Sequence, residues 1–224
     1  MKTAAILILI SLSALHFYCN AHNEKGNAPI KGQAQDTTFL KDIPYRPGRP
    51  DIFYREMKRD IADLNLDTLE AGFDSLQIRI WCTYGNLIYH QLIILKKTQG
   101  KWSGHLLSFN GNDRSQYTGE SRFFNSRRRS LTPKSGWEKF TRKLFALQIT
   151  TLPSITEIPN LKPEGTGGDG ENGIYAVEVA TPHLYRFYRY EELAIYKDRF
   201  WQASNMEKIL RLMEKEFAFK RINM

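Results

Sequence analysis

Apolar and polar side chains alternate along residues 76–84, the pattern of a β-strand with one buried face. The apolar face comprises Leu76, Ile78, Ile80 and Cys82, and the opposite face comprises Gln77, Arg79 and Thr83, with Trp81 interrupting the polar series. We therefore predict a half-buried strand here, and the rest of the sheet is built outward from it.

Gly85 and Asn86 separate this strand from a second β-type run, residues 87–95. Glycine accepts the positive φ of a type II′ turn, so the pair predicts a two-residue hairpin turn. Similar runs follow at residues 102–109 and, after a polar turn, at residues 116–124. Together the four runs predict a four-stranded antiparallel meander.

A turn at Gly85 and Asn86 fixes which residues of the first two strands face each other. It sets Ile78 opposite Ile93 and Trp81 opposite His90. The apolar pairs then meet on one face, as in a stable hairpin. We interpret His90 as a cross-strand partner that stacks on the indole, with a base or metal ligand as the alternative.

A second hairpin is predicted from residues 174–180 and 183–190, around Thr181 and Pro182. Its return strand is unusually aromatic, with Tyr185, Phe187, Tyr188 and Tyr190. We interpret these rings as packing groups against a helix; a platform for stacking sugars or bases is the alternative.

Apolar residues recur at helical spacing in residues 51–64, 136–147 and 203–217, which predicts three amphipathic helices. The last two follow Ser-x-x-Glu capping-box patterns, Ser135–Glu138 and Ser204–Glu207. The predicted fold is α+β: a curved antiparallel sheet, made of the four-stranded meander and the later hairpin, packed by helices 136–147 and 203–217. A half-open β-barrel with a helix lid is the alternative.

The chain opens with the features of an export signal, residues 1–21. Lys2 supplies a positive start, an apolar run covers residues 4–15, and Ala21 suits signal peptidase. We predict an exported protein, periplasmic or secreted. A lipid anchor at Cys19 is less favoured, because Tyr18 stands where a lipobox requires a small residue.

Residues 22–50 read as a flexible tether, stiffened by Pro44, Pro47 and Pro50, before a single globular domain, residues 51–224. Cys19 and Cys82 are the only cysteines. Signal cleavage would leave Cys82 without a partner for an intrachain disulfide. We expect it to be a small buried hydrophobic residue.

The export signal, the Trp-bearing meander, residues 175–182 (YAVEVATP) followed by residues 185–188 (YRFY), and the closing helix rich in Glu and Lys resemble small uncharacterised exported proteins of Bacteroidota. The likeness covers most of the mature chain. It implies a compartment outside the cytosol and no particular activity.

No nucleophile elbow, zinc motif or dinucleotide fingerprint occurs in the sequence. No metal or cofactor is predicted, and residues 165–173 are interpreted as a glycine-rich surface loop whose ligand, if any, stays open. His105 and Glu120 fall on adjacent predicted strands and could act as acid and base of a hydrolase. A surface hydrogen bond is the competing interpretation.

Charge separates one segment from the rest of the chain. The formal net charge is +8, and residues 122–143 contain eight basic residues against Glu138 alone, a net charge of +7. The eight basic residues are Arg122, Arg127, Arg128, Arg129, Lys134, Lys139, Arg142 and Lys143. Concentrated positive charge attracts anions, and arginine captures phosphate, sulfate or carboxylate with paired hydrogen bonds.

This segment predicts a non-catalytic envelope protein that binds an anionic lipid head group or an acidic polysaccharide, with peripheral association with a membrane. Export disfavours nucleic acid as the partner. The competing interpretation of the segment is a solvated basic turn. The alternative functions are a carrier of an apolar ligand between the sheet and the helices, and the hydrolase based on His105 and Glu120.

Overall fold

The computed structural model describes residues 39–46, 49–50, 52–83, 89–110, 126–161 and 173–221. The chain divides into two units, residues 1–36 and residues 37–224, and every described residue belongs to the second. The predicted signal peptide, Arg122, Glu120, most of the glycine-rich loop and the predicted strand at residues 116–124 lie outside the described residues.

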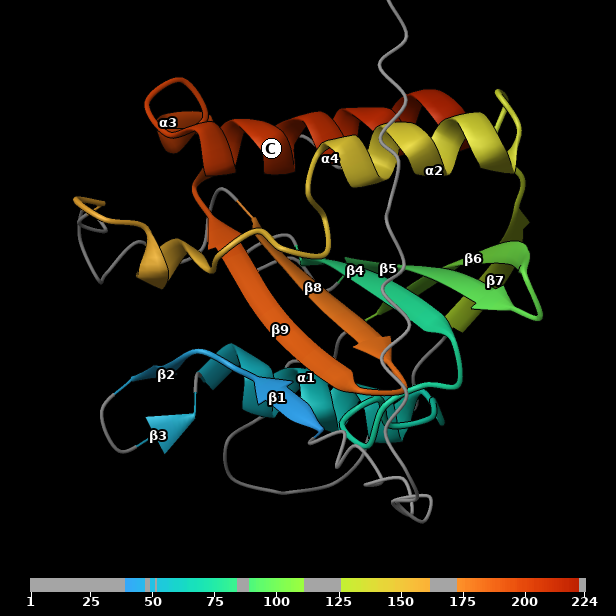
Figure 1. Ribbon diagram of the computed structural model, residues 1–224, viewed down its shortest axis with the longest axis horizontal. Helices are drawn as coiled ribbons and strands as arrows, with labels where there is room; N and C mark the ends of the chain where they lie inside the picture. The colour runs from blue at the N-terminus through green and yellow to red at the C-terminus, as the bar shows by residue number, and fades with distance from the viewer. Residues whose placement is uncertain are drawn as a thin grey trace, which may run out of the picture. The chain divides into compact units, whose positions relative to one another are not determined.

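A seven-stranded sheet forms the centre of the second unit, with strand order β1-β9-β8-β4-β5-β6-β7. Its strands are β1 (Leu40–Asp42), β4 (Leu76–Thr83), β5 (Tyr89–Thr98), β6 (Lys101–Asn110), β7 (Ser126–Leu131), β8 (Ile174–Thr181) and β9 (Leu184–Glu191). Neighbouring strands are antiparallel, except that β1 runs parallel to β9. The sheet is curved and open, with β1 and β7 at its edges, so the α+β prediction is confirmed and the barrel alternative is wrong (Figure 1).

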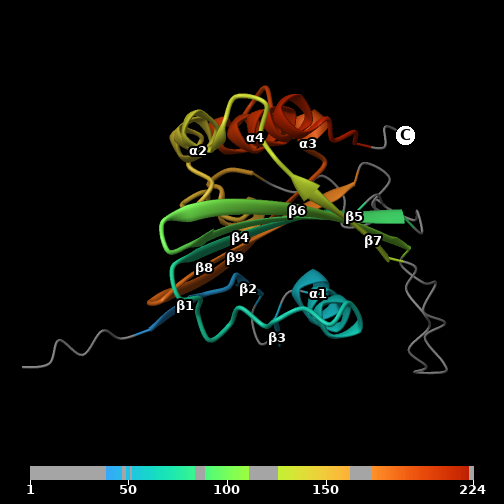
Figure 2. The same cartoon turned by 90° about the vertical axis from the view of Figure 1, so that its right-hand side faces the viewer.

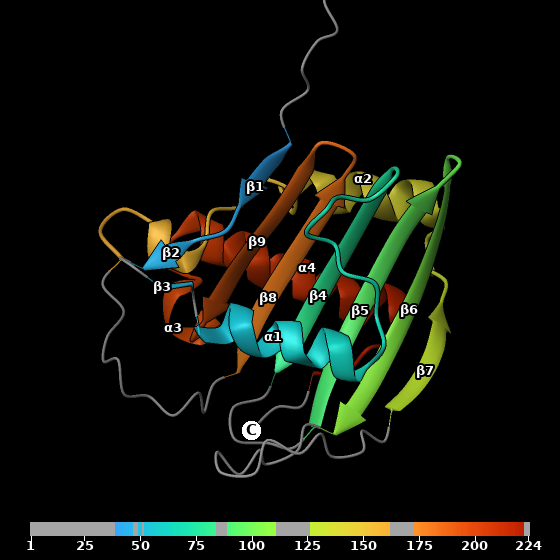
Figure 3. The same ribbon diagram turned by 90° about the horizontal axis from the view of Figure 1, so that it is seen from below.

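Helices cover both faces of this sheet (Figure 2). They are α1 (Ile52–Asp63), α2 (Trp137–Ala146), the 3₁₀ turn η1 (Ile155–Glu157), α3 (Leu193–Tyr196) and α4 (Trp201–Phe217). The helices α2, α3 and α4 form one layer, which we call the helix layer, and α1 crosses the other face of the sheet (Figure 3). A separate two-stranded ribbon pairs β2 (Tyr45–Arg46) with β3 (Arg49–Pro50).

Each face of the sheet has its own hydrophobic core. The core under the helix layer joins Ile80 and Tyr188 of the strands to Phe140 of α2 and Met213 of α4. The core under α1 contains Trp81, Phe109 and Phe187, together with residues of α1. The predicted polar face of β4 is therefore buried as well: Arg79 and Trp81 are each 1% exposed. The expectation of a half-buried strand was wrong, because the amphipathic α1 packs on that face.

The pairing between β4 and β5 differs from the predicted register by two residues. Ile78 pairs with Leu95 and Thr83 with His90. Six residues separate Thr83 from His90, so a two-residue turn does not set the register; residues 84–88, including Gly85 and Asn86, are outside the described residues. A slip of two keeps every side chain on its face, so the apolar faces still meet.

The edges of the sheet also hold two strands that the sequence pattern placed elsewhere. The fourth strand of the meander is the arginine run itself, β7, since Arg127, Arg128 and Arg129 pair with residues of β6. At the other edge, β1 comes from the segment predicted to be a tether. The second structural unit accordingly includes residues before 51.

The three predicted helices are confirmed, but neither predicted capping box forms. Gly136, with φ of 79°, precedes α2, and no side chain caps that end. Phe200 precedes α4, so Ser204 lies within the first turn of the helix rather than before it. The second hairpin is confirmed, but its turn lies one residue later than predicted, at Pro182 and His183, since Thr181 pairs with Leu184. In the described ranges, no helix is long and apolar enough to cross a membrane.

Candidate functional site

The three arginines of β7 do not share a direction, because side chains alternate along a strand. Arg127 and Arg129 belong to the side of the sheet covered by the helix layer, and Arg128 belongs to the side covered by α1. All three side chains are exposed, and β7 is an edge strand. The predicted arginine cluster is thus split across the sheet.

Arg129 has a structural role at the end of α4. Both terminal nitrogens of its guanidinium donate to the carbonyl oxygen of Phe217, each at 3.3 Å. Phe217 is the last residue of α4, where carbonyl groups lack helical partners and the helix dipole favours positive charge. Arg129 therefore connects the edge strand to the end of the helix.

Among the basic residues of α2, two are exposed and one is paired with a buried carboxylate, so these residues too do not act as one group. Lys139 and Arg142 are exposed, and Arg142 lies 3.3 Å from the carboxylate of Glu138 in an exposed pair that stabilises the helix little. Lys143 instead turns toward the end of α4, with its Nζ 3.7 Å from the buried carboxylate of Glu216. Lys134, in the connection before α2, is exposed.

The acidic residues of α4 are drawn inward, which sequence reasoning missed. The guanidinium of Arg221 donates to Glu207 at 2.8 Å and to Glu214 at 2.8 Å, folding the chain after α4 back along the helix. Glu216 is 2% exposed and accepts a hydrogen bond from the backbone N–H of Ser135 at 2.8 Å. Three carboxylates of the closing helix are therefore neutralised within the fold.

The pKa directions agree with this arrangement. Burial acts to raise the pKa of Glu207, but hydrogen bonds and charge from Arg221 and Arg211 leave it below its usual value. Burial likewise acts to raise the pKa of Glu216, and hydrogen bonds from Ser135 with the charge of Lys143 leave it lowered. Both carboxylates stay ionised and paired rather than facing solvent as free negative charges.

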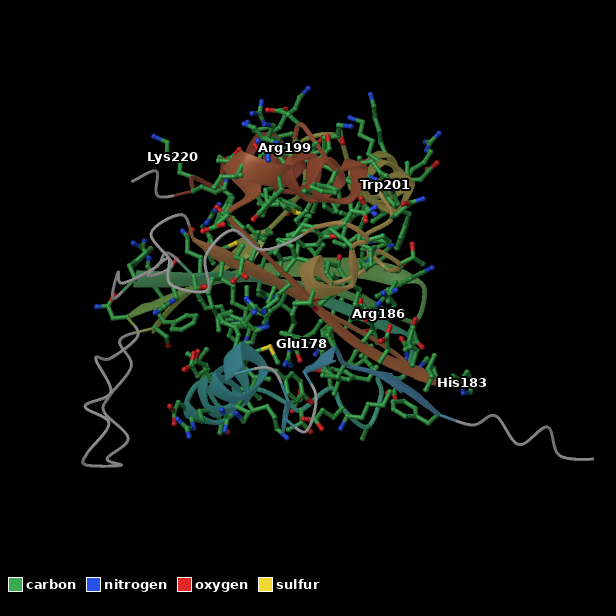
Figure 4. All side chains as sticks on the ribbon, turned by 90° about the vertical axis from the view of Figure 1, so that its left-hand side faces the viewer. Glu178, His183, Arg186, Arg199, Trp201 and Lys220 are labelled. Carbon is green, nitrogen blue, oxygen red and sulfur yellow. The ribbon has the colours of Figure 1, made fainter. Side chains whose placement is uncertain are left out.

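The outer surface of the helix layer is consequently basic. Eight exposed cationic residues line it or its flanks: Lys134, Lys139, Arg142, Arg199, Lys208, Arg211, Lys215 and Lys220. Glu138 and Asp198 are the exposed acidic residues of the same segments. We call this the basic helix surface; Figure 4 shows nitrogen-tipped side chains extending from it away from the sheet.

Charge differs strongly between the two helical layers. Residues 134–146 and 192–221 contain eleven Lys and Arg against six Asp and Glu, a net charge of +5. Residues 52–75, which contain α1, have three Lys and Arg against six Asp and Glu, a net charge of −3. The sheet therefore separates a positive layer from a negative one, and the positive layer draws on α4 as well as on the predicted segment.

A second polar cluster is buried under α1. Glu178 of β8 accepts hydrogen bonds from the indole Nε1 of Trp81 at 2.9 Å and from the hydroxyl of Tyr185 at 3.0 Å. Arg79 lies 3.6 Å from the same carboxylate and donates to the carbonyl oxygen of Asp67 at 2.6 Å. Glu178 and Arg79 are each 1% exposed. This network joins β4, β8 and β9 and is a structural part of the core.

His90 and Cys82, two further candidate residues, both lie within the sheet. His90 stacks on Phe109, with ring centroids 5.4 Å apart, rather than on Trp81 as predicted. Cys82 is a free, buried thiol, as predicted, and burial raises its pKa to about 12, so it is not a nucleophile near neutral pH.

His105 lies beside Ser130 in the pairing of β6 with β7. Burial lowers its pKa, and the charges of Arg128 and Lys96 lower it further. Its proposed partner Glu120 is outside the described residues, so the hydrolase hypothesis stays a prediction. Within the described part of the chain, no group of three or more His, Cys, Asp or Glu residues is arranged to hold a metal ion.

Tyr185, Phe187, Tyr188 and Tyr190 are all buried, which confirms that they pack within the cores rather than forming a stacking platform.

The sequence of α4 does contain a signal for the basic helix surface, namely the lysines and arginines on the exposed face of the helix. The sequence did not reveal this surface, because Glu207 and Glu216, which pair with Arg221 and Ser135 in the fold, alternate along the helix with those cations.

No protein-family model matches the chain, and no curated protein matches it.

Proposed function

We propose that this is an exported, non-catalytic protein of the cell envelope that binds an anionic partner through the basic helix surface. The observation that carries the proposal is the separation of charge across the sheet. Eight exposed cations gather on one side, and three carboxylates of α4 are neutralised by internal partners. The export signal predicted for residues 1–21 supports the compartment.

Such a surface attracts anions in a defined orientation. Like charges gathered on one layer produce a stronger local potential than the same charges spread evenly, and the negative α1 layer is repelled by the same partner. The net charges of +5 and −3 therefore favour approach of the helix layer toward phosphate, sulfate or carboxylate groups. Salt should weaken the interaction, because the cations are exposed.

The structure changes how the predicted site must be tested. Replacing Arg127, Arg128 and Arg129 together would remove the group that holds the end of α4, so lost binding could reflect a loosened fold. Lys139 and Lys208 are better targets, because both are exposed and lie on different helices of the layer. Arg55 and Arg59 of α1 are also exposed and supply a matched control.

We would measure binding to immobilised heparin and to phosphatidylglycerol-containing vesicles at low and high salt. The K139E/K208E double variant should bind at least tenfold more weakly than the wild-type protein, since each cation near an anionic surface contributes about 1 kcal/mol. The R55E/R59E variant has the same net charge and should bind within about twofold of the wild type. Equal weakening by both variants, or no salt-sensitive binding to either probe, would overturn the proposal.

A further inference from the structure

The helix layer exposes large hydrophobic side chains, two of them at the corner where α3 is followed by α4. Among the described residues, the exposed large hydrophobic side chains are Leu40, Phe145, Ile195 and Trp201, and the last three belong to the helix layer. Phe145 contacts Trp102, with ring centroids 6.1 Å apart. Ile195 of α3 is 37% exposed and Trp201, the first residue of α4, is 55% exposed.

The connection between α3 and α4 holds this corner in place. The backbone N–H groups of Arg199 and Phe200 both donate to the carbonyl oxygen of Tyr196 at 3.0 Å. The rings of Tyr196 and Phe200 pack edge to face with centroids 6.2 Å apart. Trp201 is therefore displayed by a hydrogen-bonded, packed turn.

The exposed indole shares the helix layer with cationic side chains. Figure 4 shows Arg199 and Trp201 on the helix layer, across the sheet from α1. Arg199 is exposed, and the basic helix surface continues along α4 through Lys208 and Arg211. A free anionic polymer gains little from an exposed indole and isoleucine. An anionic bilayer provides both head-group charge for the cations and an interfacial region that favours tryptophan.

This inference rests on the proposed function. We infer that the anionic partner is the surface of a lipid bilayer with anionic head groups, and that Trp201 inserts at the level of the head groups. The cations of the helix layer supply long-range attraction, and the aromatic corner supplies contact that salt does not screen. The protein then lies on the membrane through its helix layer, with α1 facing away.

Tryptophan fluorescence tests this inference directly. Trp81 is buried, Trp102 and Trp137 are partly buried, and Trp201 is the most exposed of the four tryptophans. The difference between the spectra of the wild-type protein and W201F isolates the emission of Trp201. On adding phosphatidylglycerol vesicles, we expect this emission to shift to shorter wavelength and to be quenched by brominated acyl chains.

Affinity measurements provide the matched comparison. W201A should bind the vesicles about tenfold more weakly than the wild-type protein, while its affinity for heparin stays within about twofold. L40A, which removes an exposed hydrophobic side chain from the sheet edge at β1, should leave both affinities unchanged. Thermal unfolding of each variant verifies that the fold is retained.

The outcomes separate this inference from the proposed function. Salt-sensitive binding to heparin and vesicles, with no shift of Trp201 emission and equal affinities for W201A and the wild type, overturns the bilayer inference and leaves anion binding standing. Binding to neither probe overturns both. A shift of Trp201 emission with selective loss of vesicle binding in W201A supports the membrane assignment.

Discussion

Glu178 is a single carboxylate on which three strands of the sheet depend. It accepts hydrogen bonds from Trp81 of β4 and Tyr185 of β9 while lying 3.6 Å from the guanidinium of Arg79. Removing a charge from water is costly, and this cost is offset only while each member of the network keeps its partners. We therefore expect the network to specify how the strands pair more than it adds to net stability.

Replacing Glu178 by alanine should lower the free energy of unfolding by about 3–5 kcal/mol, because it leaves the buried charge of Arg79 uncompensated. Chemical denaturation followed by circular dichroism measures the change. The R79M/E178M double variant should be more stable than E178A, since no buried charge is left. A double variant less stable than E178A would show that the pair itself is the main source of stability.

At the scale of elements, the connection between β7 and α4 rests on Arg129. R129A should lower the free energy of unfolding by about 1 kcal/mol, because the carbonyl oxygen of Phe217 loses a charged donor at the end of the helix. R127A, on the same side of the same strand, is the control and should change stability by less than about 0.5 kcal/mol. Equal effects of the two substitutions would contradict the role given to Arg129.

Helices were predictable from the sequence because their apolar spacing alone identifies the buried stripe, as with Met206, Ile209 and Met213 of α4. Their starts were not, since a cap depends on how the chain enters the helix. Ser204 fits a capping box in sequence, yet α4 already begins at Trp201. The register of β4 with β5 failed for a similar reason: the local Gly85–Asn86 signal does not determine the pairing, and cross-strand packing does.

Edge strands were the least predictable elements. The arginine run of β7 lacks any apolar alternation, and its pairing with β6 is maintained by backbone hydrogen bonds that the side-chain pattern does not reveal. The short β1 pairs with β9, more than a hundred residues away in the sequence. Neither strand buries a complete face, so neither has the alternating pattern by which strands are recognised.

At the scale of the whole second unit, the fold pairs or buries acidic side chains of α4 and leaves basic side chains exposed, which a count of charged residues does not reveal. The sequence of α4 contains three Lys and Arg against three Glu, so its composition alone does not identify it as basic. The structure pairs Glu207 and Glu214 with Arg221 and buries Glu216, so lysines and arginines dominate what remains exposed. This outcome depends on where the chain folds after the helix, which helical periodicity does not predict.

Lysine labelling of the protein with and without phosphatidylglycerol vesicles, with each site quantified by mass spectrometry, tests most directly whether the basic helix surface is the binding face. Binding through the helix layer predicts slower labelling of Lys139, Lys208 and Lys215 when vesicles are present. Lys58 on α1 and Lys101 at the turn between β5 and β6 are exposed references, and their labelling should be unchanged. Protection of Lys58 or Lys101 equal to that of the helix-layer lysines would contradict the claim that the positive layer is the binding face.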